Sequence, residues 1–337
     1  MEKPITPFPI SQECSVSELV QRMAETSFQA RNLAHGVEIW SQMLEGEVTI
    51  FLGLAGAMVP AGMRQVMVYL IENRLIDCLV STGANLFHDL HESLGRAHWK
   101  GSASADDRQL SKAKIYRIYD VLTSEEEFDD TEEFATNFSN RLEQDRAYTT
   151  REYFFLLGKE LSSQGKQEGI LTAAAKANLP IYCPAPGDSV FGPAIAAGRV
   201  NKGNNLLFDV IKDLIEMVQI AACSKSTGGI YIGGGTPKNY VQQIVRCGDI
   251  LGQELNGHQY AIQITTDSPQ WGGLSGCTFD EARSWRKVSP EAATVTINCD
   301  ATIAFPLMVS ALSEASAEAI KNRNRLAFHL GRELTIL

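Results

Sequence analysis

The sequence predicts an α/β protein with a doubly wound, mostly parallel sheet that is covered by helices on both faces. Apolar segments rich in β-branched residues recur along the chain, and most of them end at glycine or aspartate. Segments with helical spacing separate them, as in successive β-α-β units. The chain has 337 residues, 44% hydrophobic and 21% charged, which is typical of a globular protein with a sizeable core.

The first predicted β-α-β unit has strands at 48–56 and 75–83 and a helix at 60–74. Each of these strands is apolar and ends at a glycine. A helix and a strand follow within 169–189, and a long amphipathic helix spans 204–224. The remaining strands are expected at 228–235, 260–267 and 293–302, with helices at 237–251 and 305–320.

One acidic stretch interrupts this alternation. Residues 123–138 have weak apolar periodicity, so we expect an exposed helix or a solvated excursion between two units. Residues 1–26 are expected to form an N-terminal extension, and residues 27–337 a single domain.

Composition excludes several classes of protein. The formal net charge of -10 argues against a nucleic-acid partner. No segment approaches 18 uninterrupted apolar residues and the start has no signal-peptide pattern, so we expect a cytoplasmic protein without a membrane segment. The seven cysteines form no C-x-x-C pair, which indicates neither a disulfide framework nor a four-thiolate zinc site.

The stretch "YIGGGTPKNY", residues 231–240, is the first candidate binding element. A predicted strand ends at Gly233, Gly234 and Gly235, Thr236 is suited to cap a helix, and Pro237 fits the first helical position. Free N–H donors beside a backbone without side chains are how α/β proteins bind phosphate or pyrophosphate, so a nucleotide is the expected ligand. The pattern is not G-x-G-x-x-G, and a plain tight turn is the alternative.

Three aspartates follow predicted strands, where open α/β sheets bind ligands. These residues, Asp188, Asp267 and Asp300, are candidates to hold ribose hydroxyls, although each is equally suited to cap the next helix. His88 and His91 have the i, i+3 spacing of metal ligands on a helix. No third ligand is evident, so we expect no metal site.

Several stretches together resemble the deoxyhypusine synthase family, in order from about residue 27 to residue 315. The most specific features are the glycine triplet, the Ser-Trp-x-Lys pattern and the Asp-Ala-x-x-x-Phe-Pro pattern. The matching stretches are "SFQARNLAHGVEIW" (27–40), "TIFLGLAGAMVPAGMRQVMVYLIEN" (49–73), "CPAPGDSVFG" (183–192), "STGGIYIGGGTPKN" (226–239), "DEARSWRKV" (280–288) and "DATIAFPLMV" (300–309).

The resemblance implies a Rossmann-like NAD-binding fold, assembled as a homotetramer with sites at a dimer interface. In that family NAD takes a hydride from spermidine, and the resulting imine passes its aminobutyl group to an enzyme lysine. An acceptor amine then collects the group, and the same NADH reduces the new imine. The polyamine is a small-molecule substrate, and the acceptor can be a lysine of a protein.

The family's site residues carry over by position. The covalent lysine corresponds to Lys287, which needs a free amine, and burial beside Trp285 would favour that form by desolvation. Asn239 stands where the family has its catalytic histidine. The implied cofactor-binding residues are Asp188, Gly233, Gly234, Gly235, Thr266, Asp267, Ser275, Asp300 and Ala301. The implied substrate-binding residues are Trp271, Leu274, His88 and Glu281.

This sequence also departs from the family pattern. Phe87 and His88 replace paired glutamates, Gly56 and Ala57 replace a Ser-Asn pair, and Trp271 and Leu274 stand where the eukaryotic enzymes have aspartates. Each lost charge-assisted contact to a dication costs about 1.5–3 kcal/mol, which cation–π contact with Trp271 would partly offset. The departures resemble the bacterial deoxyhypusine synthase-like branch.

The leading interpretation is an NAD-dependent alkylamine transferase that acts through Lys287. A small diamine acceptor, giving a homospermidine synthase-like reaction, is slightly favoured by the altered pocket. The alternative is a deoxyhypusine synthase that modifies a lysine of a translation factor. A further alternative is an NAD-binding regulatory tetramer without turnover, suggested by Asn239.

Overall fold

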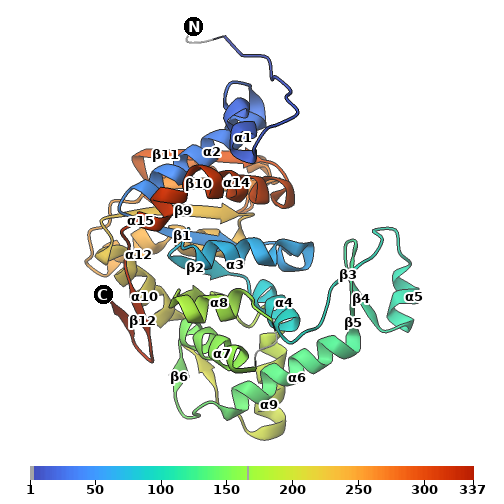
Figure 1. Ribbon diagram of the computed structural model, residues 1–337. Coiled ribbons are helices and arrows are strands. Elements are labelled where there is room, and N and C mark those ends of the chain that lie inside the picture. The colour runs from blue at the N-terminus through green and yellow to red at the C-terminus, as the bar shows by residue number, and fades with distance from the viewer. Residues whose placement is uncertain (1–3, 165–166) are drawn as a thin grey trace.

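A six-stranded parallel sheet forms the centre of the protein, in the strand order β11-β10-β9-β1-β2-β7 (Figure 1). The computed structural model describes residues 4–164 and 167–337. The strands are β1 (Val48–Leu54), β2 (Cys78–Ser81), β7 (Ile181–Tyr182), β9 (Ser226–Ile232), β10 (His258–Thr265) and β11 (Val288–Asn298). The prediction of an α/β protein with a mostly parallel sheet is confirmed.

The order of the strands reverses beside β1. From β1 the chain proceeds through β2 to β7 at one edge, and then returns to pair β9, β10 and β11 on the other side of β1. This is the arrangement of doubly wound sheets, in which ligands bind outside the carboxyl ends of the strands at the reversal. The topology therefore predicts a binding site at the loops that follow β1 and β9.

Helices cover both faces of the sheet, so the side chains of a central strand enter two separate cores. Ile50, Leu52 and Leu54 of β1 face one core and Phe51 faces the other, and all four are fully buried. The first core is covered by α2 (Phe28–Glu45), α3 (Arg64–Glu72), α8 (Ile170–Ala177) and α14 (Ala301–Ala315). The second is covered by α10 (Val210–Cys223), α11 (Gly235–Gln242), α12 (Ile244–Ile250) and α13 (Phe279–Ser284).

The helix predicted at 60–74 begins with an irregular turn, Val59–Met63, where Gly62 has φ 85°, and continues as α3. The helix predicted at 237–251 is divided at Gln243 into α11 and α12. Three further helices outside the long connection between β2 and β7 are α1 (Val16–Ala24), α9 (Phe191–Lys202) and α15 (Ala317–Asn322). No helix in the two described ranges combines the length and apolarity needed to cross a membrane.

The connection from β2 to β7 is long and includes an arm that extends from the body (Figure 1). After α4 (Gly83–Ser93), the arm contains β3 (Trp99–Lys100), α5 (Asp107–Lys112), β4 (Ile115–Ile118) and β5 (Val121–Ser124). The chain returns through α6 (Glu125–Arg141), β6 (Ala147–Tyr148) and α7 (Thr150–Gln164), and β6 pairs with β8 (Leu207–Phe208). The acidic stretch is therefore mostly helical, and it is not fully solvated because Thr131, Ala135 and Phe138 of α6 are buried.

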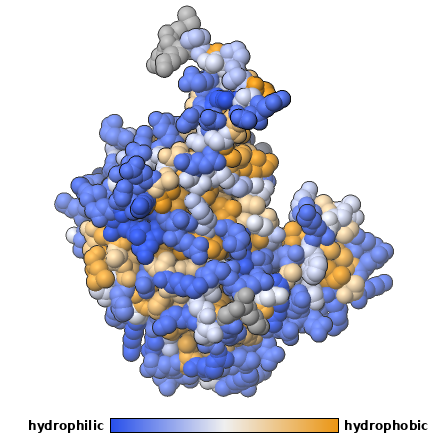
Figure 2. All heavy atoms as spheres, viewed as in Figure 1, coloured by the Kyte–Doolittle hydropathy of each residue, from blue (hydrophilic) through white to orange (hydrophobic). Residues whose placement is uncertain are grey.

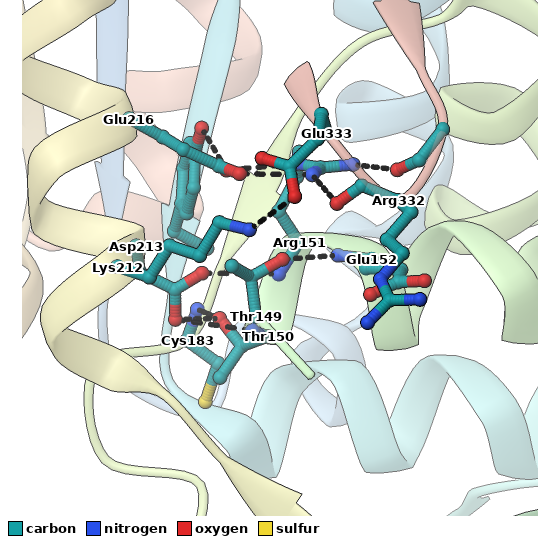
Figure 3. A network of polar contacts seen from close by, with 12 residues as sticks. Thr149, Thr150, Arg151, Glu152, Cys183, Lys212, Asp213, Glu216, Arg332 and Glu333 are labelled. Carbon is teal, nitrogen blue, oxygen red and sulfur yellow. Dashed lines mark hydrogen bonds and ion pairs between the residues drawn. The ribbon is translucent and has the colours of Figure 1, made fainter. Parts of the chain in front are cut away.

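A buried polar network joins α7, α10 and the C-terminal hairpin of β12 (Phe328–Leu330) and β13 (Leu334–Ile336) (Figure 3). Arg151 donates to both carboxylate oxygens of Glu216, at 2.8 and 2.9 Å, and to the carbonyl oxygen of Gly331. Asp213 accepts from the backbone N–H and the hydroxyl of Thr150, and burial raises the pKa of Asp213 to about 7. The network fixes the hairpin against the sheet's second face.

The N-terminal residues do not all lie apart from the body. Helix α1 is capped by Ser15, whose hydroxyl accepts from the N–H of Glu18, and Val20 of this helix is 3% exposed in the first core. A groove of about 630 Å³ runs between α1, α2 and α14. Figure 2 shows apolar atoms gathered over this part of the visible face and on the arm.

Three histidines connect α4 to the arm. His91 bonds through its two ring nitrogens to the hydroxyls of Thr131 (2.9 Å) and Thr123 (3.2 Å). His88 bonds to His98, which also contacts Glu92 at 2.7 Å. Burial, together with the neighbouring histidines, lowers the pKa of His91 to about 4 and that of His88 to about 3.

We expect the protein to lose stability in acid through these histidines. The folded pKa of His91 lies below the ordinary value of 6.5, so the unfolded chain binds the extra proton first, and stability falls as the pH decreases from about 6.5 toward 4. His91→Gln should reduce the loss of unfolding free energy between pH 7 and pH 4 by roughly 2 kcal/mol. Urea unfolding at both pH values measures this, with the exposed His35→Gln as control. An unchanged pH dependence in His91→Gln would contradict the assignment.

Candidate active site

A cleft of about 450 Å³ opens at the carboxyl edge of the sheet, where the strand order reverses. It is formed by the loops that follow four adjacent strands, β1, β9, β10 and β11. Its walls include Ala55, Gly56, Ala57, Met58, Ala61, Ile232, Gly233, Gly234, Ile264, Thr265, Thr266, Asp267, Ser275, Cys299, Asp300, Ala301 and Thr302. Most of the residues predicted to bind the cofactor are thus brought together around one cleft.

The glycine triplet forms the turn from β9 into α11. Gly233 and Gly235 have φ 72° and 55°, in the left-handed region that favours glycine. Gly234 has no room for a side chain, because a Cβ there would lie 2.3 Å from the Cα of Ser275. The turn therefore needs glycine for its own geometry, and it also leaves backbone without side chains at the cleft.

Helix α11 begins at Gly235, two residues earlier than the sequence predicts. The expectation that Thr236 caps this helix is wrong, because Gly234 occupies the N-cap and Thr236 lies inside the first turn. The hydroxyl of Ser275 instead accepts from the N–H of Gly235 at 3.2 Å. Pro237 is the third residue of α11 and not the first, but it still lies in the first turn, where its missing N–H removes no helical hydrogen bond.

Lys238 connects this turn to the loop after β10. Its side chain is 1% exposed, and the ammonium donates to Gln263 Oε1 (2.8 Å) and to the carbonyl oxygen of Cys277 (2.5 Å). The amide of Gln263 in turn donates to the carbonyl oxygens of Gly233 and Ser275. Burial lowers the pKa of Lys238 to about 8. One buried ammonium thus fixes the backbone on both sides of the glycine turn.

Lys287 lies beside α11 and precedes β11. Its amine donates to Asn239 Oδ1 at 2.9 Å, and it makes no ion pair with any residue in the described ranges. Asn239 is four residues after Gly235, which places the amine roughly one helical turn, about 5.4 Å, beyond the start of α11. The position predicted to be catalytic is therefore near the cleft but is not part of its wall.

Trp285 contacts the amine of Lys287. The amine lies 5.7 Å from the centroid of the indole, within the range of a cation–π contact. Trp285 itself is 65% exposed and Lys287 is half-buried, so the expected desolvation of the amine beside Trp285 stays a prediction. Trp271 and Leu274 are also exposed, at 72% and 46%, which leaves three large apolar side chains uncovered in this region.

The carboxylates of the cleft have different local roles. Asp300 caps α14, because its Oδ1 accepts from the N–H and hydroxyl of Thr302 at 2.7 and 2.6 Å. These hydrogen bonds hold the pKa of Asp300 below its usual range. Among the described residues, the Asp267 carboxylate accepts from the N–H of Ser268 alone, so most of its acceptor capacity is available in the cleft. Glu281, in the first turn of α13, lies beside the thiol of Cys277.

Several predicted site residues are not part of the cleft walls, among them Gly235, Trp271, Leu274 and Glu281, and two lie in other parts of the fold. Asp188 is exposed in the loop after β7, and the neighbouring Ser189 packs against Gly83 at the start of α4. Its loop is at the carboxyl edge of the sheet but does not border the cleft, because β7 is two strands away from β1. His88 lies in the histidine cluster of the arm, 9% exposed, and is also outside the cleft walls. Their roles in binding remain predictions.

No group of three or more candidate metal ligands comes together in residues 4–164 and 167–337. The histidine cluster binds hydroxyls, another histidine and one carboxylate of the chain itself. Its geometry is therefore explained by contacts within the arm.

The sequence reasoning missed Lys238 and Gln263. Gln263 lies within a buried apolar strand, where an amide must find hydrogen-bond partners. Lys238 stands in the first turn of a helix, where the helix dipole disfavours a cation. Both signals can be read in the sequence: an amide within an apolar strand, and a cation in the first turn of a predicted helix.

Comparison with known proteins decides the family. The family model named deoxyhypusine synthase matches residues 18–312, which include the glycine turn, Lys287 and Asp300. The chain belongs to the deoxyhypusine synthase family. It is accordingly a member of a family of transferases, as the resemblance indicates.

Named relatives cover most of the chain. A protein of Methanosarcina acetivorans named "Probable deoxyhypusine synthase 2" is 49% identical over 89% of this chain and 87% of its own length. A "Deoxyhypusine synthase-like protein" of Chlorobaculum parvum is 38% identical, over 87% of this chain and 85% of its own. The crystal structure of an Entamoeba histolytica protein with a provisional deoxyhypusine synthase assignment is 20% identical, covers 89% of this chain and 93% of that chain, and has a TM-score of 0.62, which shows a shared fold.

The packing of Gly234 against Ser275 gives a test of the site's framework. Gly234→Ala should destabilise the protein by roughly 1–3 kcal/mol, because the new Cβ displaces backbone rather than a flexible side chain. Urea unfolding measures the difference, and Gly187→Ala is the matched control, since a Cβ at Gly187 has no atom within 4 Å. Equal stability of Gly234→Ala and the wild type would show that this contact does not hold the turn.

Proposed function

We propose that the protein catalyses NAD-dependent transfer of an aminobutyl group from a polyamine, through an imine on Lys287, to an acceptor amine. The observation that carries the proposal is the placement of Lys287 about one helical turn from a glycine turn at the reversal of a doubly wound sheet. Membership of the deoxyhypusine synthase family supports the same reaction class.

The cleft residues suit a dinucleotide. The turn at Gly233 and Gly234 presents backbone without side chains, and the N-terminus of α11 begins there. Asp267 and Asp300 offer carboxylate oxygens to ribose hydroxyls from the ends of two other strands. Thr266, Ser275 and Ala301 line the remaining wall. When bound, NAD supplies a hydride acceptor for the donor amine and later a hydride donor.

Lys287 is arranged to act as the covalent carrier. Asn239 holds the amine through a neutral amide oxygen, so no carboxylate contact favours the charged ammonium. In the transfer step, the neutral amine adds to the imine carbon of the oxidised donor and the donor's remaining diamine leaves with the proton. The acceptor amine then adds to the Lys287 imine and releases the lysine in the same way.

The acceptor is the finer part of the proposal, and we favour a small diamine. Trp271 and Leu274 stand where the eukaryotic family members have carboxylates, and Asp267 and Asp280 are the carboxylates nearest to these positions along the chain. Indole faces attract ammonium groups through cation–π contact, which suits a short diamine. The names of the relatives favour instead a protein lysine as acceptor, and that reaction is the alternative outcome. A third possible outcome is that the protein binds NAD without turnover.

Assembly into a homotetramer with sites at a dimer interface is part of the proposal. The exposed side chains of Trp271, Leu274 and Trp285 support it, because large apolar side chains are normally covered, and Trp285 contacts the Lys287 amine. A second copy seated over them would exclude water from the imine.

Lys287→Arg should retain the fold and NAD affinity but lose transfer activity, because a guanidinium cannot form the imine. Products are measured after incubation with NAD, spermidine and either putrescine or a translation factor that carries the acceptor lysine. The surface variant Lys112→Arg serves as control. Transfer by Lys287→Arg at the wild-type rate would refute the covalent mechanism, and product with only one acceptor identifies the reaction.

A further inference from the structure

A second hollow, of about 120 Å³, lies at the opposite edge of the sheet from the cleft. It lies beside Asp77, which precedes β2, and beside the segment that leads into β12. Its walls are formed by Ile71, Arg74, Ile76, Asp77, Ala177, Asn178, Leu179, Arg325, Leu326, Ala327 and Phe328. We call it the arginine hollow.

Three arginines and one carboxylate meet around the arginine hollow. Asp77 is already engaged, because its Oδ2 accepts from the N–H of Ile50 at 2.7 Å and from the guanidinium of Arg323. Arg323 also donates to the carbonyl oxygen of Arg74 at 2.8 Å. The guanidinium groups of Arg74 and Arg325 make no hydrogen bond or ion pair with any described residue, although both side chains are half-buried.

This excess of positive charge is unusual for the molecule. The chain carries a formal net charge of -10, yet here the carboxylate of Asp77 is the one carboxylate among the residues that line the hollow. It pairs with Arg323 and attracts Arg325 without a direct ion pair, so three guanidiniums share one carboxylate. Burial and the charges of Arg74 and Arg323 lower the pKa of the Arg325 guanidinium. Like charges held together at a partly desolvated site destabilise the fold unless an anion lies between them.

We propose that the arginine hollow binds a small tetrahedral oxyanion of the inorganic phosphate type, held between Arg74 and Arg325. Arginine presents two parallel N–H donors that match phosphate oxygens, and Arg74 and Arg325 both line a hollow large enough for one phosphate. Asn178 lines the same hollow and is a candidate to supply a further donor. This inference is independent of the reaction at Lys287.

The experiment compares melting temperatures in sodium phosphate and sodium chloride at equal pH and ionic strength, followed by calorimetric titration with phosphate. The wild type should melt several degrees higher in phosphate and bind it with saturation. Arg325→Gln and Arg74→Gln should each weaken phosphate binding at least tenfold and lose the phosphate-specific shift. In chloride these variants should be as stable as the wild type or more stable, because a repulsion has been removed.

The exposed Arg108→Gln is the matched control and should keep both the shift and the affinity. An equal phosphate shift in Arg325→Gln and the wild type would assign the effect to other surface sites and overturn the proposal. No saturable binding to the wild type would overturn it as well. A large loss of stability of Arg325→Gln in chloride would show that the guanidinium has a structural partner and no ligand.

Discussion

The buried ammonium of Lys238 is the constraint on which the candidate site depends. It lies among the oxygens of Gln263 and Cys277 without a carboxylate in hydrogen-bond contact, and through Gln263 it controls the carbonyls of Gly233 and Ser275. Removing a cation from water is costly unless its donors are satisfied, so this arrangement tolerates little change in the surrounding backbone. The glycine turn, the start of α11 and the loop that carries Ser275 therefore form one unit. Asn239 follows Lys238 directly and is therefore positioned by the same unit. Through its hydrogen bond, Asn239 also positions the amine of Lys287.

The two edges of the sheet have different chemistry. At the carboxyl edge, four loops combine small residues, backbone donors and carboxylates around an open cleft. At the amino edge, the C-terminal segment brings two arginines to Arg74 and Asp77, where the chain after α15 turns toward its final hairpin. The C-terminal residues thus both close the second core and create the arginine hollow. The arm between α4 and α6 is held by a histidine cluster in which burial lowers the pKa of His88 and His91.

Much of this arrangement could be predicted from the sequence, because the apolar strands and the glycine turn are local patterns. The resemblance to a family supplied Lys287, Asp267 and Asp300. The structure places the two aspartates around one cleft, and Lys287 contacts Asn239 of the helix that follows the glycine turn. The position of Asp188 could not be predicted, since it depends on where β7 joins the sheet, which no local pattern encodes. His88 was expected near the substrate, but the arm folds back over α4 and encloses it with His98. The role of Lys238 could not be predicted either, because its partners are 25 and 39 residues away.

The central claim is that Lys287 carries the transferred group, and borohydride trapping tests it most directly. The protein is incubated with NAD and spermidine, reduced with borohydride, and the intact chain and its peptides are weighed. The account predicts an aminobutyl adduct on the peptide that contains Lys287, formed only when NAD is present. Product formation with no adduct on Lys287, or an adduct on another lysine such as Lys238, would contradict it.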